Sequence, residues 1–388
     1  MKISKHGRNA LGAFAVVAML ADCNGSQAAL SPSGPAGAAV LRANPRASTR
    51  ATTALACVGN RYGVAQCDAL VRTDVRPNAA PAGPAGGFAP ADLQKAYNLP
   101  SASRGAGQIV AIVDAYDNPN VASDLAQYRA AFGLPPASFY KYNQDGQKGH
   151  YPAGDTGWGI EIDLDAEMVS AVCPNCTIDL VEANSNSWSD LEKAEAEAVT
   201  LGAHVVSNSA GGTGAKQKYF DTKGVTYVAS SGDGGFGVGE PAAFDSVVAV
   251  GGTTLVQGGG GERGWTESAW SSSSGGCTSQ PKPLWQHDRT CAFRLANDVS
   301  AVGDPNTGVA EYDTYGVGGW FVVGGTSVSA PLIAGIFGLA GNATKQDGGR
   351  TFWQKAHHPY LYRIQSGGKY VRYSTSGGWG TPDGIGAL

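Results

Sequence analysis

The run Gly324–Pro331 contains a serine, Ser327, and leads directly into a long apolar segment, residues 332–340. This segment is apolar on every side, so the helix that it predicts should be buried centrally. A serine at the N-terminus of such a helix lies near free backbone N–H groups and the positive end of the helix dipole, which stabilise a developing negative charge on oxygen. Ser327 could serve only as a helix N-cap. The preceding glycines, which let a substrate backbone come close, favour a nucleophile instead.

A nucleophilic serine needs a base, and the sequence does not offer a histidine in a suitable place. The string Gly-Thr-Ser-x-Ser-x-Pro around Ser327 resembles the nucleophile signature of the subtilisin-like superfamily, whose base is carried by a His-Gly-Thr-His string that is missing here. The chain has six histidines, and none of them opens a glycine-rich helical turn: His6, His150, His204, His287, His357 and His358. The base must therefore be another type of residue.

An acidic helix, predicted near residues 160–172, supplies two candidates for this base. On a wheel of about 100° per residue, Glu161 and Asp165 fall inside the apolar arc, whereas Asp163 and Glu167 fall outside it, as solvated acids should. Acids four residues apart share one helix face. Two acids on an apolar face lower the stability of the folded protein unless they share protons or take part in chemistry. The alternative is that they form a polar interruption of the apolar face without a catalytic role.

Three motifs together resemble the sedolisin family, the serine-carboxyl peptidases, which have a subtilisin-like fold with glutamate in place of histidine. Residues 161–165 fit the family's Glu-x-x-Leu-Asp, residues 231–235 fit its Ser-Gly-Asp-x-Gly, and residues 325–331 fit its nucleophile string. The resemblance covers the chain from about Gly87 to the C-terminus. It implies that Ser327 is the nucleophile, Glu161 the general base and acid, Asp165 its supporting partner, and Asp233 a protonated donor to the oxyanion.

The resemblance implies a secreted serine-type endopeptidase that is active at acidic pH. A carboxylate is a useful base only near its own pKa, and acid also keeps Asp233 protonated. The expected partners are polypeptide substrates, and we expect a monomer. The sequence has no basic cluster that would suggest a nucleic acid. The alternative is an inactive secreted binding module that retains the fold, against which the intact Glu161, Asp165, Asp233 and Ser327 argue.

Strand and helix patterns alternate from residue 108 onwards, which predicts an α/β fold: a subtilisin-like, doubly wound, mostly parallel sheet flanked by helices. In such a sheet the site lies at the carboxyl ends of the strands, where Ser209 and Asp233 are expected. Asp114 also follows a strand, at the place of a subtilisin's triad aspartate, but without a histidine it is left out of the site. Ser207, Ser209 and Gly211 lie in a run that resembles the substrate-pairing strand of these peptidases.

The chain of 388 residues is expected to contain three parts. Residues 1–28 have bases before an apolar stretch, as in a secretory signal peptide. Residues 29–86 are rich in Ala, Pro and Arg and are interpreted as a short pro-region and linker, and residues 87–388 as the sedolisin-like peptidase domain. This predicts an extracellular or periplasmic protein, with lipid anchoring at Cys23 as a minor alternative.

Six further cysteines pair by proximity as Cys57 with Cys67, Cys173 with Cys176, and Cys277 with Cys291. An oxidising compartment would turn these pairs into disulfides, although six cysteines allow other pairings. The Cys173–Cys176 pair closes a predicted helix instead of opening one, which favours a structural disulfide over a redox motif.

No cofactor and no metal are expected, although calcium near the C-terminus is usual in the sedolisin family. Arg363 and Gly380 stand where the family has aspartate ligands. Calcium needs six to eight oxygen ligands, usually including carboxylates. We expect the Arg363 guanidinium to bond loop carbonyls in place of the metal, with Asp383 as a possible substitute ligand.

Overall fold

A ten-stranded sheet forms the centre of the fold, and its middle strands are apolar runs that are buried on both faces. The order is β19 (Lys369–Tyr370), β18 (Gln365–Ser366), β11 (Trp265–Ala269), β10 (Val247–Gln257), β9 (Thr226–Ser230), β7 (Val205–Asn208), β4 (Ile109–Ala115), β6 (Thr177–Ala183) and β5 (Ser138–Asn143), with β14 (Val299–Val302) beside β10. The neighbouring strands β10, β9, β7, β4, β6 and β5 are parallel, as is β14 to β10, while β11 is antiparallel to β10.

This computed structural model describes residues 51–57, 61–75, 86–259 and 261–388, all of which fall within one unit of the chain, Thr49–Leu388. The predicted signal peptide and Cys23 lie outside the described residues.

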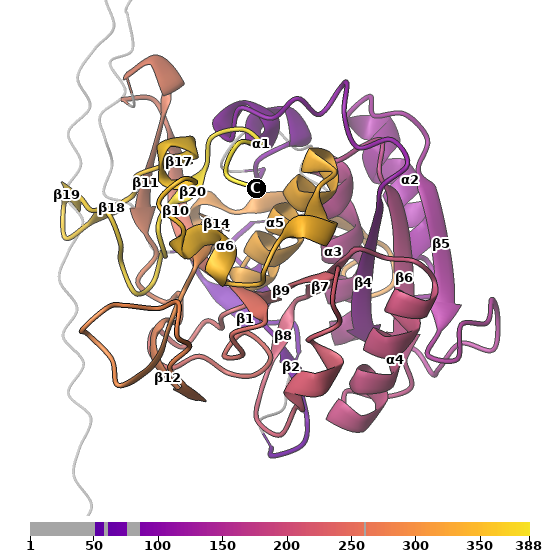
Figure 1. The fold of residues 1–388 in the computed structure, drawn as a ribbon. Coiled ribbons are helices and arrows are strands. Elements are labelled where there is room, and N and C mark those ends of the chain that lie inside the picture. Colours follow the sequence, from indigo (N-terminus) through magenta and orange to yellow (C-terminus); the bar gives the residue numbers. More distant parts are fainter. Residues whose placement is uncertain (1–50, 58–60, 76–85, 260) are drawn as a thin grey trace, which may run out of the picture. The chain divides into compact units, whose positions relative to one another are not determined.

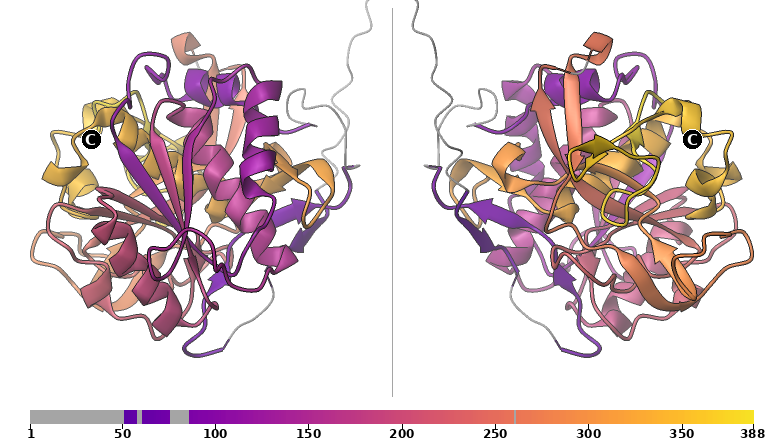
Figure 2. Two further views of the ribbon diagram at one scale, coloured as in Figure 1. Left: turned by 90° about the vertical axis from the view of Figure 1, so that its right-hand side faces the viewer. Right: turned by 90° about the vertical axis from the view of Figure 1, so that its left-hand side faces the viewer.

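Helices cover both faces of the sheet (Figure 2). The described residues form α1 (Pro90–Ala96), α2 (Val121–Ala131), α3 (Thr156–Val172), α4 (Trp188–Thr200), α5 (Thr326–Ala340) and the single turn α6 (Arg350–Trp353). The helices α3 and α5 pack side by side (Figure 1), and α4 packs on β4 and β6. The predicted subtilisin-like α/β fold is confirmed. The strand β5, which alternates between exposed and half-buried residues, was not predicted.

Residues 51–57 and 61–75 are paired with the rest of the unit, although the sequence predicted only pro-region and linker there. The strand β3 (Leu70–Arg72) joins β1 (Thr53–Leu55) to β16 (Gly319–Gly324), which in turn pairs with β15 (Val309–Asp313). The strand β2 (Gln66–Cys67) pairs with β8 (Ala210–Gly211). The remaining two-stranded sheets are β12 (Gly276–Pro281) with β13 (Phe293–Ala296) and β17 (Leu361–Tyr362) with β20 (Thr381–Pro382).

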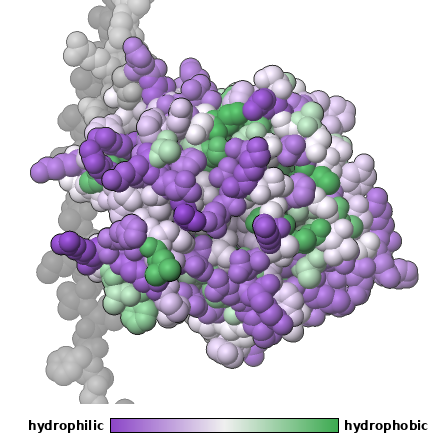
Figure 3. Space-filling view, in the orientation of Figure 1, coloured by the Kyte–Doolittle hydropathy of each residue, from purple (hydrophilic) through white to green (hydrophobic). Residues whose placement is uncertain are grey.

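The three disulfides predicted from the sequence are present in the structure. Disulfides join Cys57 to Cys67, Cys173 to Cys176, and Cys277 to Cys291. On the face shown in Figure 3, apolar residues lie in separate patches between hydrophilic ones. Among the described residues, no helix has both the length and the apolar character needed to span a bilayer.

Candidate active site

Ser327 lies in the first turn of α5, and both the residue and the helix are buried. The N-cap is Gly325, whose φ of 107° lies in the left-handed region that favours glycine. The Ser327 hydroxyl donates a hydrogen bond to the backbone carbonyl of Ser209 at 2.9 Å. The structure thus holds a hydroxyl at the N-terminal end of a buried helix, where the helix dipole favours negative charge.

Glu161 and Asp165 lie in α3, next to α5. Asp155 caps this helix by accepting hydrogen bonds from the backbone N–H groups of residues 157 and 158. The Asp165 carboxyl group accepts a hydrogen bond from the Ser209 hydroxyl at 2.6 Å. Glu161 is fully buried, and its carboxyl oxygens have no hydrogen-bond partner among the described residues.

Burial raises the pKa of Glu161 well above its usual range, and the charges of Asp165 and Asp114 raise it further. The nearby Ser327 hydroxyl lowers this pKa, although in this structure the hydroxyl is bonded to Ser209 and not to Glu161. Burial, and then the charge of Asp114, also raises the pKa of Asp165 well above its usual range. Such carboxyl groups can keep and exchange protons in a range where exposed acids are ionised.

Asp114, which the sequence analysis left out of the site, belongs to this group of carboxyls. It lies near the end of β4, is fully buried, and burial raises its pKa to about 7. Its position at the carboxyl end of a central parallel strand was the sequence signal that pointed to it. It acts on Glu161 and Asp165 through its charge, so the three groups must titrate together.

Asp233 follows β9 and faces the start of α5. One of its oxygens accepts hydrogen bonds from the Thr326 backbone N–H at 2.8 Å and from the Thr326 hydroxyl at 3.0 Å. The other oxygen, Oδ2, has no partner within the described part of the chain. Burial raises the pKa of Asp233 well above its usual range, and the charge of Asp68 adds to the effect. A protonated Asp233 could therefore donate from its free oxygen.

The candidate substrate strand separates into two parts. Ser209 lies beside Ser327. Gly211 lies in β8, where it pairs with Gln66 of β2. Ser207 lies within β7 and is buried inside the central sheet. The structure brings Ser209 and Gly211 to the site, but not Ser207.

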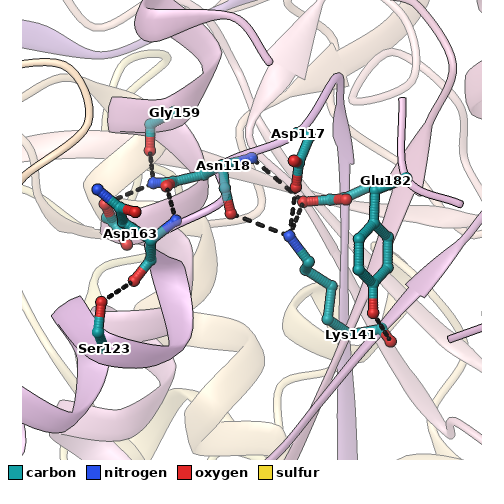
Figure 4. Close-up of polar contacts among 9 residues, drawn as sticks. Asp117, Asn118, Ser123, Lys141, Gly159, Asp163 and Glu182 are labelled. Carbon is teal, nitrogen blue, oxygen red and sulfur yellow. Dashed lines mark hydrogen bonds and ion pairs between the residues drawn. The ribbon is translucent and has the colours of Figure 1, made fainter. Parts of the chain in front are cut away.

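The expectation that Asp163 and Glu167 are solvated is wrong, because both are fully buried. Figure 4 shows Asp163 bonded to the Asn118 amide, which donates to it at 2.7 Å and to the Gly159 carbonyl at 3.0 Å. Lys141 lies on the other side of Asn118 and pairs with Glu182 at 3.3 Å. Asp163 therefore belongs to a separate polar network and does not face Ser327.

Three buried carboxyls, Asp124, Asp163 and Asp313, place oxygen atoms within 4.8 Å of one another. Asp313 uses its oxygens to accept backbone N–H groups of the turn at residues 315–317, and Asp124 accepts from Thr314. These contacts join Asp124 and Asp313 to the turn after β15.

In the C-terminal loop, several oxygen atoms accept hydrogen bonds from the protein. The carbonyls of Gly377 and Gly380 accept hydrogen bonds from Ser300, and Asp383 accepts one from Asn98. Arg363 is exposed and lines a cavity of about 800 Å³. Among the described residues it donates no hydrogen bond to the loop carbonyls, so the expected substitution of the metal by its guanidinium is wrong.

The doubly wound sheet and the buried central helix, with a serine in its first turn, are typical of subtilisin-like proteins. Residues 142–363 match the subtilase family, peptidase S8. The chain therefore belongs to the subtilase family, in its sedolisin branch, and the resemblance stated from the motifs is confirmed.

Two curated relatives carry this placement. The chain is 31% identical to kumamolisin from Bacillus sp. (strain MN-32) over 296 residues, which cover 64% of this chain and 51% of kumamolisin. It is 26% identical to sedolisin from Pseudomonas sp. (strain 101) over 360 residues, covering 79% of this chain and 60% of sedolisin. The chain thus spans between half and two thirds of the length of these relatives.

Solved structures support the fold. Pseudomonas sedolisin, described as a serine-carboxyl proteinase complexed with pseudo-iodotyrostatin, superposes with a TM-score of 0.65 at 24% identity, over 76% of this chain and 95% of the sedolisin chain in that solved structure. Fervidolysin from Fervidobacterium pennivorans, a keratinolytic enzyme related to subtilisin, gives a TM-score of 0.51 at 15% identity, over 79% of this chain and 45% of fervidolysin.

Proposed function

We propose that this protein is a secreted serine-type endopeptidase that cleaves polypeptides at acidic pH. The observation that carries the proposal is the buried, unpartnered Glu161 carboxyl group, kept close to Ser327 and to Asp165 and with a raised pKa. Other acids in this protein are also buried, but Glu161 lies beside a serine hydroxyl at the N-terminal end of a helix, which is where a general base is needed. The kumamolisin and sedolisin relationships support the same reaction class.

Each catalytic residue has a role that its surroundings support. The Ser327 hydroxyl attacks the carbonyl carbon of the substrate, and Glu161 takes its proton and gives it to the leaving amine. Asp165, held by Ser209, raises the pKa of Glu161 through its charge and so helps it to hold the proton that it takes from Ser327. Asp233 donates from Oδ2 to the oxygen on which negative charge develops, together with the Ser327 backbone N–H. Water then releases the acyl group from Ser327.

The proposal extends to the organisation of the chain. Residues 1–28 are a signal peptide, residues 29–86 a short pro-region and linker, and residues 87–388 the peptidase domain, acting as a monomer. Three disulfides favour an oxidising compartment.

Hydrolysis of acid-denatured haemoglobin at about pH 4, within the range of carboxylate pKa values, tests the proposal. We expect new amino groups to appear at acid pH and much more slowly at pH 8. An inactive binding module would release none at either pH.

Glu161→Gln should lower kcat at least about a hundredfold, because the amide keeps the size of the side chain but cannot exchange a proton. Asp163→Asn is the matched control: it is buried in the same helix, but its partner is Asn118 and it does not face Ser327. We expect it to change kcat less than about fivefold, far below the contribution of a proton-transferring group. Equal losses in the two variants would remove Glu161 from the mechanism.

The protein should hold no calcium at its C-terminal loop, because Arg363 and Gly380 stand where the family has aspartate ligands, and Arg363 adds a positive charge. Elemental analysis of dialysed protein should find well under one equivalent of calcium, and a chelator should leave Tm unchanged. One equivalent of calcium with a large drop in Tm on chelation would contradict this expectation.

A further inference from the structure

The cavity that Arg363 lines has a volume of about 800 Å³. Its walls come from three segments: residues 285–295, residues 353–363, which run from the end of α6 to β17 (Figure 1), and residues 372–379. Among the described residues that line it, none belongs to the candidate active site. Small-molecule sites in proteins have volumes of about 300–1,000 Å³, so this cavity is large enough to be one.

Four aromatic side chains line the cavity and contact one another. The ring centroid of Trp353 lies 6.0 Å from that of Trp285. It lies 5.3 Å from the ring centroids of Tyr373 and Trp379. All four residues are half-buried, so each of them keeps part of its surface open. Such a wall fits a planar, apolar ligand body, because aromatic rings attract one another in stacked and edge-to-face arrangements.

Buried groups hold two of these rings in place. The Trp353 indole N–H donates to Asp298 Oδ1 at 2.8 Å, and Asp298 is itself paired with Arg294 at 2.7 Å. The Tyr373 hydroxyl donates to the backbone carbonyl of Asn297 at 3.0 Å. Both polar ends are thus bonded inside the protein, and the rings are fixed before a ligand arrives. Fixed rings lower the entropy that is lost on binding.

Three cations line the same cavity: Lys355, Arg363 and Arg372. All three are exposed, and within the described part of the chain none of them forms an ion pair. Among the described lining residues the acid is Asp288, and Lys282 pairs with it at 2.8 Å. The cavity therefore has an excess of positive charge, which favours an anion.

His358 lies in the field of these cations. Its ring stacks on Trp379 with centroids 4.1 Å apart. Burial lowers the pKa of His358, a hydrogen bond with the Phe352 carbonyl raises it, and neighbouring positive charges, those of Arg372 and Lys355 among them, lower it further. The positive charge thus reaches the aromatic wall itself, where a bound anion would be attracted.

We propose that this cavity binds a small aromatic anion, a planar ring system that carries a carboxylate or sulfonate group. The rings pack on the wall around Trp353, and the guanidinium groups of Arg363 and Arg372 bind the acid group. A guanidinium group can bond two oxygens of such an acid with parallel N–H donors. The site uses none of the catalytic residues, so it does not depend on the proposed function.

Calorimetric titration of full-length protein with 2-naphthalenesulfonate, at low ionic strength where charges are little screened, tests the proposal. The sulfonamide of the same ring system is the neutral control, and hexane-1-sulfonate is the anion without rings. We expect saturable binding of 2-naphthalenesulfonate, at least about tenfold tighter than that of either control, because a charged hydrogen bond and ring contact each strengthen binding. Absence of binding, or equal affinity for either control, would overturn the proposal.

Arg363→Gln/Arg372→Gln protein locates the site. Both residues are exposed, so the double variant should fold. We expect its affinity for 2-naphthalenesulfonate to fall at least about tenfold and its affinity for the sulfonamide to stay within about threefold of the parent, because the charged hydrogen bonds alone are lost. An unchanged affinity for the sulfonate would place its binding elsewhere and overturn the assignment.

Arg104→Gln is the matched control for charge. Arg104 is exposed and is not among the residues that line the cavity. Its replacement should change the affinity for 2-naphthalenesulfonate less than about twofold, because an exposed charge elsewhere on the surface is screened by solvent and salt. A loss in this control as large as that in the double variant would show that the anion responds to overall charge only, and would overturn the proposed site.

Discussion

Replacing Ser327 by alanine should lower peptidase activity at least about a thousandfold while the protein stays folded, because a nucleophile is required for the chemical step. The Ser327 hydroxyl makes two hydrogen bonds, from the Asp68 N–H and to the Ser209 carbonyl. Their loss costs about 1–3 kcal/mol, and the Ser209 carbonyl keeps its bond from Asp68. Haemoglobin hydrolysis and far-UV circular dichroism of the same sample measure both effects.

Ser329→Ala is the matched control for this variant. Ser329 is buried in the same helix two residues further on, but its hydroxyl donates to the carbonyls of Ala301 and Val302 in β14. The substitution removes hydrogen bonds of the same kind and should lower activity only a few fold. Retention of more than about one hundredth of the activity in folded Ser327→Ala protein would remove Ser327 as the nucleophile.

The sequence was sufficient to predict the elements that carry the site, because they are local. The apolar run of α5 and the strands β4, β7 and β9 have periodicities that can be recognised within ten residues, and Ser327 and Asp233 follow from their positions at element ends. The acidic helix shows the limit of this reasoning. A helical wheel assumes one solvent face, but α3 packs against α2, α5, β4 and β15, so Asp163 and Glu167 are buried as well.

The contact of the N-terminal strands with the candidate site could not be predicted from the sequence. Residues 51–57 and 61–75 have the composition of a linker, and they are held by pairing with residues far along the chain: Leu70 with Gly324, and Gln66 with Gly211. Such pairings depend on the three-dimensional course of both partners, so no local pattern reveals them. Asp68, which was assigned no role, turned out to contact the nucleophile.

The protein should be most stable in acid and lose stability toward neutral pH. Burial raises the pKa of Asp68 and Asp114 to about 7, and raises that of Glu161, Asp165 and Asp233 well above their usual range. In the unfolded chain the same groups lose their protons near pH 4. The folded state therefore binds more protons than the unfolded state above pH 4. The free energy of unfolding is fully retained below about pH 4 and falls as the pH rises through the folded pKa values.

Each carboxyl that keeps its proton in the folded state lowers the free energy of unfolding by about 1.4 kcal/mol per pH unit. For a chain of this size we expect Tm at pH 7 to lie at least about 10 °C below Tm at pH 4, as measured by scanning calorimetry. Glu311→Gln provides the matched test outside the candidate site, because Glu311 is buried, its oxygens have no partner among the described residues, and burial raises its pKa well above the usual range. The amide cannot ionise, so this variant should match the parent at pH 4 and be more stable at pH 7. A Tm that stays constant or rises between pH 4 and pH 7 would show that these carboxyls are ionised in the folded protein. Asp233 would then have no proton to donate to the oxyanion.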